Sequence, residues 1–483
     1  MATAYERTVS TPEAQLPSRE KTKNSNKQIL QQQSTIAADS EGQSAAVMER
    51  DVFGNEEGAE TAYKTCEWWH TGILMIAGNV SLGVLALPQA LAILGLVPGL
   101  LCICFLGLIA TYTGWIIGEF KLAHPQVHSF ADCGFLIAGP IGREVLAVAQ
   151  VFILIFVMGA HLLTFAVAMN AITEHGACTI VFSVVGLTVC FLLGLPRTFK
   201  NVSYCSIFSC LSIIIAVLVA MIAIGIEKSN KGDILAVRKG VPLVKGLGPV
   251  LNIVLAYTGH VAFFSFQAEL RNPRDFNKAL VFSQSIAITF YMTISVVIYY
   301  FAGPLVASPA LGSASPLMSK VCFGIAIPTI VIAGVIAGSV ACKYIYIRVW
   351  AGTDVVHSNS WTSVGSWVGI CAGIWCVSWV LAEAVPNFNL LLGLVGALFG
   401  SWFSYAIPPV LWMYQHKGRL FSSKKMIALT VMNCAVCLMG LTIFGLGMWS
   451  SGWELNRGSG GKVFSCANNW NPVSWVGEDA KSH

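Results

Sequence analysis

Long apolar segments constrain the fold of this chain more than any other feature of its sequence. A bilayer core about 30 Å thick requires about 20 apolar residues for each transmembrane helix. Eleven segments approach or exceed this length, and we predict that each spans a membrane: residues 71–93, 98–120, 144–170, 178–195, 204–226, 247–268, 277–302, 320–346, 363–383, 387–412 and 426–450. Their apolar runs are continuous rather than alternating, which excludes a transmembrane β-barrel. The expected fold class is an all-α polytopic membrane protein.

The distribution of charge agrees with this fold class. Of the 483 residues, 55% are hydrophobic and 11% are charged, whereas a soluble protein has about 25% charged residues. Residues 1–70 hold 18 of the 53 charged side chains, so the other 413 residues share 35. No soluble surface has so little charge. These numbers exclude a soluble enzyme, a nucleic-acid-binding protein and a secreted disulfide scaffold.

Motifs for enzymatic chemistry are missing from the sequence. It has no phosphate-binding loop, no HExxH metal motif and no nucleophile elbow. Cys434 and Cys437 match a CxxC pattern, but they lie inside an apolar segment without a second pair, so we interpret them as packing residues. We therefore predict a protein that is not an enzyme, has no cofactor and no metal site, and contacts membrane lipid but no nucleic acid.

Three regions are expected along the chain. Residues 1–65 are rich in Gln, Ser, Lys and Glu, so they form a disordered tail, either a regulatory segment or a solvated leader. Residues 66–450 form the transmembrane domain, and residues 451–483 form a C-terminal tail. Lys and Arg favour cytoplasmic segments. With the N-terminus inside, the cytoplasmic segments hold 20 of these residues and the opposite segments hold 9, so we predict a cytoplasmic N-terminus and an extracellular C-terminus.

The first span contains residues that interrupt a helix in the middle of the membrane. Gly78 and Gly83 flank the polar Asn79 and Ser81, and Pro88 leaves a carbonyl oxygen one turn earlier without its helical partner. Loose backbone groups are tolerated in a membrane only where they line a polar cavity. A half-helix that begins near Gly83 would direct its N–H groups at a carboxylate, whereas Asn79 and Ser81 offer oxygen atoms to a cation or an ammonium group. The alternative is a kinked helix that packs through its glycines.

The sixth span has a similar interruption. Gly259 permits unwinding, and Thr258 and His260 supply polar groups. Transporters built from inverted repeats place their substrate at discontinuous helices in corresponding positions of the two halves, and a five-plus-five division makes spans 1 and 6 correspond. The predicted substrate-binding residues are therefore Gly78, Asn79, Val80, Ser81, Leu82, Gly83, Tyr257, Thr258, Gly259 and His260.

Apart from two histidines, the apolar interiors of the spans contain almost no ionisable side chain. His260 is our first candidate for proton coupling and His161 the second, because a histidine in a membrane span is a functional candidate by default and titrates near neutral pH. A structural hydrogen bond is the alternative for each. Asn79 and Ser339 are further candidates for an ion site.

Other residues of the spans are expected to have structural roles. The glycines at the ends of Gly334–Gly338 and Gly396–Gly400 have the spacing that lets helices approach closely, and we interpret both pairs as packing residues. Glu119, Glu144, Glu269 and Glu383 fall at span ends, where their carboxylates are expected to reach interfacial water.

The cysteines indicate one disulfide. Most of the 15 cysteines lie within spans, and Cys66 and Cys133 fall on the predicted cytoplasmic side, where thiols stay reduced. Cys178 and Cys466 are left on the opposite side. We predict that they form a disulfide that holds the C-terminal tail; the alternative is two thiols.

Three stretches of the sequence resemble the signature of a known family. Residues 79–88, continuing to 95–99, resemble the opening signature of the amino acid/auxin permease family. Residues 269–278 resemble the loop after its sixth helix, and residues 386–401, followed by Pro408-Pro409, resemble its tenth helix. The likeness runs from about residue 66 to 450 and is greatest to the fungal neutral and aromatic amino acid permeases of the methyltryptophan-resistance, or N-system, type.

The resemblance implies the eleven-helix form of the five-plus-five, LeuT-like inverted repeat, with helices 1 and 6 broken. It also implies alternating-access uptake of neutral, bulky or aromatic amino acids across the plasma membrane. In sodium-coupled relatives an Asn at the position of Asn79 helps to hold Na⁺, whereas fungal members are usually proton-coupled, so the expected partners are an amino acid and H⁺ rather than Na⁺. Two alternatives are an organellar exporter of the same fold and an amino-acid sensor with little flux.

Overall fold

The computed structural model describes residues 64–197, 199–227, 234–356, 358–457 and 462–470. Its regular secondary structure there is helical, with one isolated β-bridge between Cys66 and Leu270. Within the described residues, nine helical segments are long and apolar enough to cross a membrane, and ten if the bent pair α2–α3 is one span; two of the nine, Leu243–Ala268 and Phe388–Gln415, consist of consecutive shorter helices. The helix Thr179–Leu193 is apolar but shorter, so the count of eleven and the inverted repeat stay predictions. The expected disordered tail, except for its last two residues, lies outside the described residues.

Each predicted span coincides with one helix or with a series of consecutive helices. In chain order these are α2 (Trp68–Asn79), α3 (Leu82–Leu94), α4 (Leu96–Ala123), α5 (Phe130–Thr173), α6 (Thr179–Leu193), α7 (Phe199–Glu227), α8 (Leu243–Ala256), η1 (His260–Ala262), α9 (Phe263–Ala268), α10 (Phe276–Ala302), α11 (Pro316–Val349), α12 (Trp361–Ala384), α13 (Phe388–Val395), the π-helix η6 (Gly396–Ala406), α14 (Ile407–Gln415) and α15 (Lys424–Asn456). Short 3₁₀ turns lie between them at η2 (Pro273–Asp275), η3 (Gly303–Leu305), η4 (Ala310–Ser313) and η5 (Asp354–Val356).

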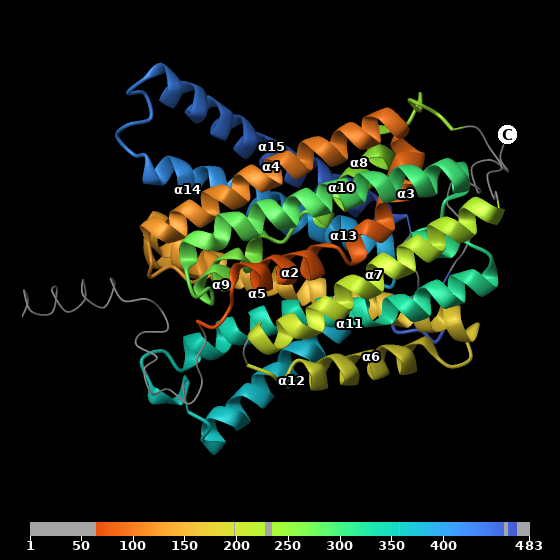
Figure 1. Ribbon diagram of the computed structural model, residues 1–483, viewed down its shortest axis with the longest axis horizontal. Helices are drawn as coiled ribbons and strands as arrows, with labels where there is room; N and C mark the ends of the chain where they lie inside the picture. Colours follow the sequence, from red (N-terminus) through yellow and green to blue (C-terminus); the bar gives the residue numbers. More distant parts are fainter. Residues whose placement is uncertain (1–63, 198, 228–233, 357, 458–461, 471–483) are drawn as a thin grey trace, which may run out of the picture. The chain divides into compact units, whose positions relative to one another are not determined.

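Successive spans run in opposite directions, so the transmembrane domain has two faces (Figure 1). We call the face where α2 begins the N-terminal face; α9 and α14 end there. We call the face where α5 ends the C-terminal face; α3 and α15 end there.

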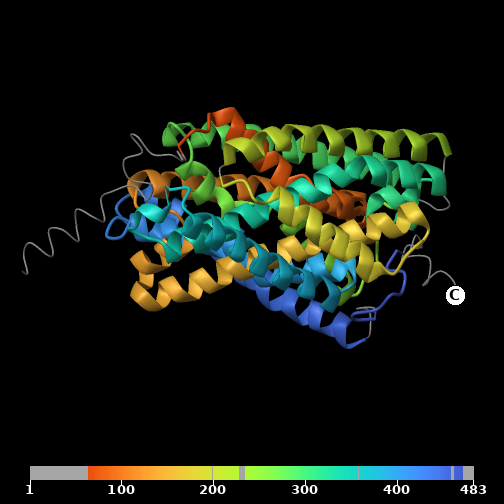
Figure 2. The same cartoon turned by 90° about the horizontal axis from the view of Figure 1, so that it is seen from below.

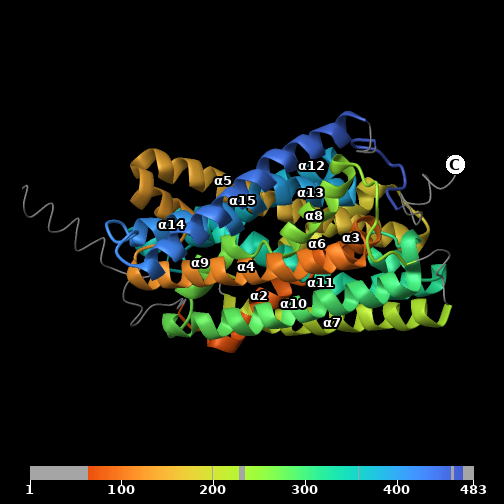
Figure 3. The same cartoon turned by 90° about the horizontal axis from the view of Figure 1, so that it is seen from above.

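The helix α5 begins earlier than the sequence predicts. It contains 44 residues, but Ala138 and Gly139 have non-helical backbone angles, with a positive φ of 64° at Gly139, and Pro140 follows. The residues before this kink form a short arm that turns back at the N-terminal face (Figures 2 and 3). Phe130 fixes the arm because its ring packs edge-on against those of Phe264 and Phe403. Apolar periodicity could not predict the arm, because its partners lie far away in the sequence.

The glycine pairs pack helices closely together, as their spacing in the sequence predicts. A Cβ atom at Gly334 would lie 3.0 Å from the Cβ of His161, and one at Gly338 would lie 3.0 Å from a tryptophan ring of α12. A Cβ at Gly396 would lie 2.4 Å from a backbone oxygen of α8, and one at Gly400 would lie 2.6 Å from a threonine hydroxyl that follows α8. The pairs therefore bring α11 against α5 and α12, and η6 against α8.

The C-terminal segment is attached to the C-terminal face. Cys178 and Cys466 form a disulfide, with their sulfur atoms 2.01 Å apart. The Thr179 hydroxyl donates to the carbonyl oxygen of Ala467 at 2.8 Å. The described residues 462–470, which we call the tail segment, thus lie across the start of α6.

Candidate functional site

The first helix break lies between α2 and α3. α2 ends at Asn79, α3 begins at Leu82, and the two helices are bent by 49° relative to each other. Ser81, which precedes α3, makes no side-chain cap hydrogen bond to it. The first N–H groups of α3, at the positive end of its dipole, are therefore not occupied by this side chain.

The second helix break lies between α8 and α9. α8 ends at Ala256, and the chain passes through Tyr257, Thr258 and Gly259 before the 3₁₀ turn η1 begins. A Cβ atom at Gly259 would lie 2.2 Å from the Asn79 side-chain oxygen. The missing side chain at position 259 therefore lets the two breaks touch, with the Asn79 amide against the second one.

A tyrosine from α10 joins the two breaks. The Tyr291 hydroxyl lies 2.7 Å from the carbonyl oxygen of Asn79 and 3.0 Å from that of Ala256. Both carbonyls belong to the last residue of a helix that stops inside the membrane. A hydroxyl has one hydrogen, so the two carbonyls share one donor. No motif in the sequence marked Tyr291, because its partners come from two other spans.

A cavity of about 40 Å³ lies where the breaks meet. Its lining combines polar residues at the breaks and one histidine of α5 with aliphatic residues: Gly78, Asn79, Ser81, Leu82, Gly83, Val157, Ala160, His161, Leu255, Thr258, Leu392 and Val395. A space of this volume holds about one water molecule and cannot hold even the smallest amino acid. Six of the ten predicted substrate-binding residues line this cavity, which we call the central cavity.

The other four predicted substrate-binding residues lie behind the lining. Val80, Tyr257 and His260 are buried, and Gly259 contacts Asn79 as described above. The Tyr257 ring packs edge-on against that of Tyr291 at 5.3 Å.

The two histidines have different surroundings. His161 donates from Nδ1 to the carbonyl oxygen of Ile330 at 2.7 Å, so Nε2 of the neutral ring is an acceptor, and the residue lines the cavity. His260 lies 2.8 Å through Nε2 from the carbonyl oxygen of Ala110 and 3.0 Å from the Thr113 hydroxyl. His260 thus ties η1 to α4, and the geometry favours His161 over His260 as the residue that meets a ligand.

Ser339 lies on the face of α11 toward α2. A Cβ at Gly78 would contact Ile336 at 4.0 Å, and Ser339 follows Ile336 by three residues, so both lie on one helix face. The Ser339 hydroxyl is buried without a hydrogen-bond partner among the described residues. In the same part of the chain, no three His, Cys, Asp or Glu side chains lie close enough together to hold a metal ion.

Gly83 has a second role beside lining the cavity. A Cβ atom there would lie 2.6 Å from both the Cα and the Cβ of Ala256. The close approach that requires glycine is therefore between α3 and α8, and a larger side chain would separate these helices rather than only fill a ligand site.

Contacts close the region between the cavity and the N-terminal face. Lys343 on α11 pairs with Glu269, which follows α9, and both side chains are buried. The Cys66 N–H donates to the Glu269 carbonyl oxygen at 3.0 Å, and the Arg271 N–H donates to the Cys66 carbonyl oxygen at 2.9 Å. The expectation that Glu269 reaches interfacial water was wrong, because a cation 74 residues away in the sequence covers it.

Polar contacts also cross the C-terminal side of the cavity. The Asn389 amide on α13 donates to the Gln89 side-chain oxygen on α3 at 3.1 Å, and its own oxygen accepts from the Ser308 hydroxyl at 2.7 Å. Glu383, at the end of α12, is 6% exposed rather than solvated and accepts a hydrogen bond from Ser183 at 2.6 Å. Position at a span end therefore did not predict the surroundings of either Glu269 or Glu383.

These features define a multi-pass helical membrane protein in which two broken helices meet at a small polar cavity, an arrangement typical of secondary transporters. Residues 64–451 match the profile of the family described as "Transmembrane amino acid transporter protein". The chain therefore belongs to this family, whose members are transporters and not enzymes.

Relatives across most of the chain agree with this membership. The chain is 34% identical over 439 residues to the "N amino acid transport system protein" of Neurospora crassa, covering 88% of this chain and 93% of the relative. It is 30% identical to a "Transmembrane transporter" of Gibberella moniliformis, covering 87% and 91%. It is 23% identical to "Lysine histidine transporter-like 4" of Arabidopsis thaliana, covering 75% and 84%.

Proposed function

We propose that this protein is a secondary active transporter that carries neutral amino acids, bulky or aromatic ones in particular, across the plasma membrane together with protons. The observation that carries this proposal is the meeting of both helix breaks at one cavity beside the start of α3. The N–H groups of a helix start suit the substrate carboxylate. The side-chain oxygens of Asn79 and Thr258 suit its ammonium group.

The charge of the lining supports a neutral substrate. None of the residues that line the central cavity is Lys, Arg, Asp or Glu, and half of the lining is aliphatic. A charged substrate side chain would lose its hydration there without a partner. The preference for bulky or aromatic side chains rests on the resemblance to fungal permeases. Amino-acid transport also appears in the name of the Neurospora relative.

Alternating access is supported by the contacts on either side of the cavity. The Glu269–Lys343 pair lies toward the N-terminal face, and the contacts of Asn389 with Gln89 and Ser308 lie toward the C-terminal face. A cavity of one-water size fits a conformation between the two open ones. Opening toward one face requires one of these groups of contacts to separate.

Proton coupling is assigned to His161. Its ring lines the cavity and presents an acceptor nitrogen, and histidine is the side chain that titrates near neutral pH. We therefore expect His161→Gln to remove the response of transport to external pH. His416→Gln is the matched control, because His416 also contacts a backbone carbonyl through Nδ1, at 2.9 Å, but lies at the N-terminal face.

The test is uptake of radiolabelled L-phenylalanine into cells that lack endogenous permeases. We expect neutral and aromatic amino acids to compete, a protonophore to abolish uptake, and uptake to rise as external pH falls and to survive replacement of Na⁺. Full dependence on external Na⁺ would move the coupling ion to Asn79. Surface expression without flux would favour a sensor, and an intracellular location would favour an organellar exporter.

A further inference from the structure

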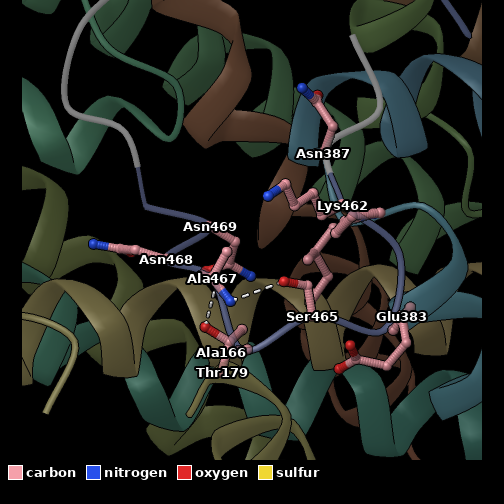
Figure 4. Close-up of a pocket in the computed structure, with 12 residues that line it drawn as sticks. Ala166, Thr179, Glu383, Asn387, Lys462, Ser465, Ala467, Asn468 and Asn469 are labelled. Atoms are coloured by element: carbon pink, nitrogen blue, oxygen red, sulfur yellow. Dashed lines mark hydrogen bonds between the residues drawn. The ribbon is translucent and has the colours of Figure 1, made fainter. Parts of the chain in front are cut away.

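A second cavity, of about 170 Å³, lies at the C-terminal face beneath the tail segment; we call it the outer pocket. Figure 4 shows its lining residues, which come from α5, α6, the end of α12, the turn before α13 and the tail segment. The tail segment is held over it by the disulfide of Cys466 and by the Asn170 amide, which donates to the Asn469 side-chain oxygen at 2.8 Å. The outer pocket is therefore a built feature of the fold.

The outer pocket follows the central cavity along the same two helices. Ala160 and His161 of α5 line the central cavity, whereas Leu163 and Ala166 line the outer pocket. A helix rises about 1.5 Å per residue, so the two linings are separated by about one turn. The second helix is α13. Asn387, just before α13 begins, lines the outer pocket, whereas Leu392 and Val395 of α13 line the central cavity.

Charges of opposite sign line the outer pocket. The Glu383 carboxylate is buried and accepts from Ser183, but no Lys, Arg or His forms an ion pair with it in the described part of the chain. A buried carboxylate without a countercharge is costly, so this site suits a ligand cation. Lys462, on the tail segment, supplies a cation on another part of the lining, and Figure 4 shows Ser465 between the two.

We propose that the outer pocket binds a zwitterionic neutral amino acid before it enters the central cavity. Its ammonium group binds Glu383, its carboxylate binds Lys462, and its side chain lies against Leu163, Ala166 and Ala382. A cavity of about 150 Å³ accommodates a benzene ring, so an amino acid of moderate size fits. The inference rests on the proposed transport function, in which a substrate passes from the outer pocket to the central cavity.

The test measures how many molecules of radiolabelled L-phenylalanine bind to each purified full-length chain, together with uptake. We expect two molecules for the native chain and one for Lys462→Gln and for Glu383→Gln. In uptake, both variants should raise KM about tenfold and leave the maximal rate unchanged. A tenfold change in KM is what loss of one hydrogen bond to a charged group is expected to cause. Lys462→Arg should retain both molecules, and Cys466→Ser, which releases the tail segment, should lose one.

Lys239→Gln is the matched control, because Lys239 is an exposed lysine that does not line the outer pocket. One bound molecule in a native chain that transports would overturn the proposal and leave the transport function standing. Neither binding nor transport by the native chain would reject both. Lys245 lines a neighbouring cavity. If Lys245→Gln loses the second bound molecule and Lys462→Gln keeps it, the second molecule binds in that cavity, and the proposal is overturned. Lys462 is exposed, so its variants remain informative if Glu383→Gln fails to fold.

Discussion

The Tyr291 hydroxyl lies 2.7 Å from the backbone carbonyl oxygen of Asn79, which connects the seventh span to the point where the first helix stops. The same hydroxyl lies 3.0 Å from the carbonyl oxygen of Ala256, where α8 stops. One donor for two carbonyls means that a change in either break alters the hydrogen bond available to the other. Tyr291 is thus placed to couple the two half-helices that line the central cavity.

Removing this hydroxyl should weaken both helix breaks. In Tyr291→Phe, neither carbonyl keeps its tyrosine donor, at a cost of about 1–3 kcal/mol in the free energy of unfolding. We expect a lower thermal midpoint for the purified protein and reduced uptake at normal surface expression. Tyr300→Phe, on the same helix but with an exposed side chain, should change neither quantity. A Tyr291→Phe protein with native stability and native uptake would show that the hydroxyl does not support the breaks.

A side chain at Gly259 should act through Asn79. Gly259→Ala places a Cβ 2.2 Å from the present position of the Asn79 side-chain oxygen, so the amide must move away from the second break. We expect a large loss of substrate affinity with little loss of folded protein, because the displaced group is the end of a flexible side chain, and a greater loss of affinity in Gly259→Val.

The control for Gly259→Ala is Gly373→Ala on α12. A Cβ there has no atom within 4 Å, and alanine raises helix propensity by about 1 kcal/mol, so transport should be unchanged. Combining Gly259→Ala with Asn79→Ala separates the causes. If displacement of the amide explains the defect, the double variant should be no worse than Asn79→Ala alone; an additional loss would point to a different role for Gly259.

The features that the sequence predicts are those with a local signal. Apolar runs located the spans, and glycines beside polar residues inside such runs located both breaks, at Asn79 to Leu82 and Ala256 to His260. Local signals say which residues interrupt a helix but not which atoms they approach. Gly83 illustrates the limit, because its flexibility was visible in the sequence whereas the Ala256 backbone that it contacts was not.

Long-range partners account for what the sequence did not predict. Tyr291 satisfies carbonyls that are 212 and 35 residues away, and Lys343 covers a carboxylate that its position at a span end assigned to water. The order of the two histidines also depended on tertiary contacts, since both lie in apolar spans and only His161 lines the cavity. Such roles become visible only when the spans are packed together.

The loop before α5 provides a pH-dependent contribution to stability. The pKa of His128 is lowered to about 3, mainly by burial and in smaller part by the nearby ammonium groups of Lys121 and Lys343. Because the ordinary pKa is about 6.5, the unfolded chain binds a proton between pH 6.5 and 3 that the folded chain does not. This contribution to stability is therefore complete above pH 6.5 and is lost as the pH falls, by about 2 kcal/mol at pH 5.

We expect His128→Gln to flatten this pH dependence. The measurement is the thermal midpoint of the purified protein at a fixed scan rate between pH 7.5 and 5, where the native chain should lose more stability than the variant. Control substitution of His124, which is not buried, should leave the slope unchanged. Parallel curves for the native chain and His128→Gln would mean that His128 does not remain neutral in the folded protein.

The Glu269–Lys343 pair should be sensitive to loss of either partner and tolerant of loss of both. Lys343→Met or Glu269→Gln changes one member of a buried ion pair; the lysine variant leaves a buried charge without its partner, which costs about 3–5 kcal/mol in the free energy of unfolding. The double variant leaves no such charge and should recover most of this loss. The nearby pair of Arg271 with Glu67 has side chains that are 70% and 45% exposed, so its removal should cost at most about 1 kcal/mol.

On the proposed alternating-access mechanism, opening toward the N-terminal face would separate the Glu269–Lys343 pair together with the hydrogen bond from the Cys66 N–H to the Glu269 carbonyl oxygen. Cys66 is 1% exposed, so the labelling rate of its thiol reports separation of this contact. We expect Cys66 to be labelled faster in Lys343→Met than in the native chain. Labelling at Cys66 is followed by mass spectrometry, because other cysteines, such as Cys205, are exposed and react as well. Faster labelling in Lys343→Met but not in Arg271→Gln would identify the buried pair as the contact that restrains opening. Equal labelling rates of Cys66 in the native chain and both variants would mean that the pair contributes to stability but does not restrain opening.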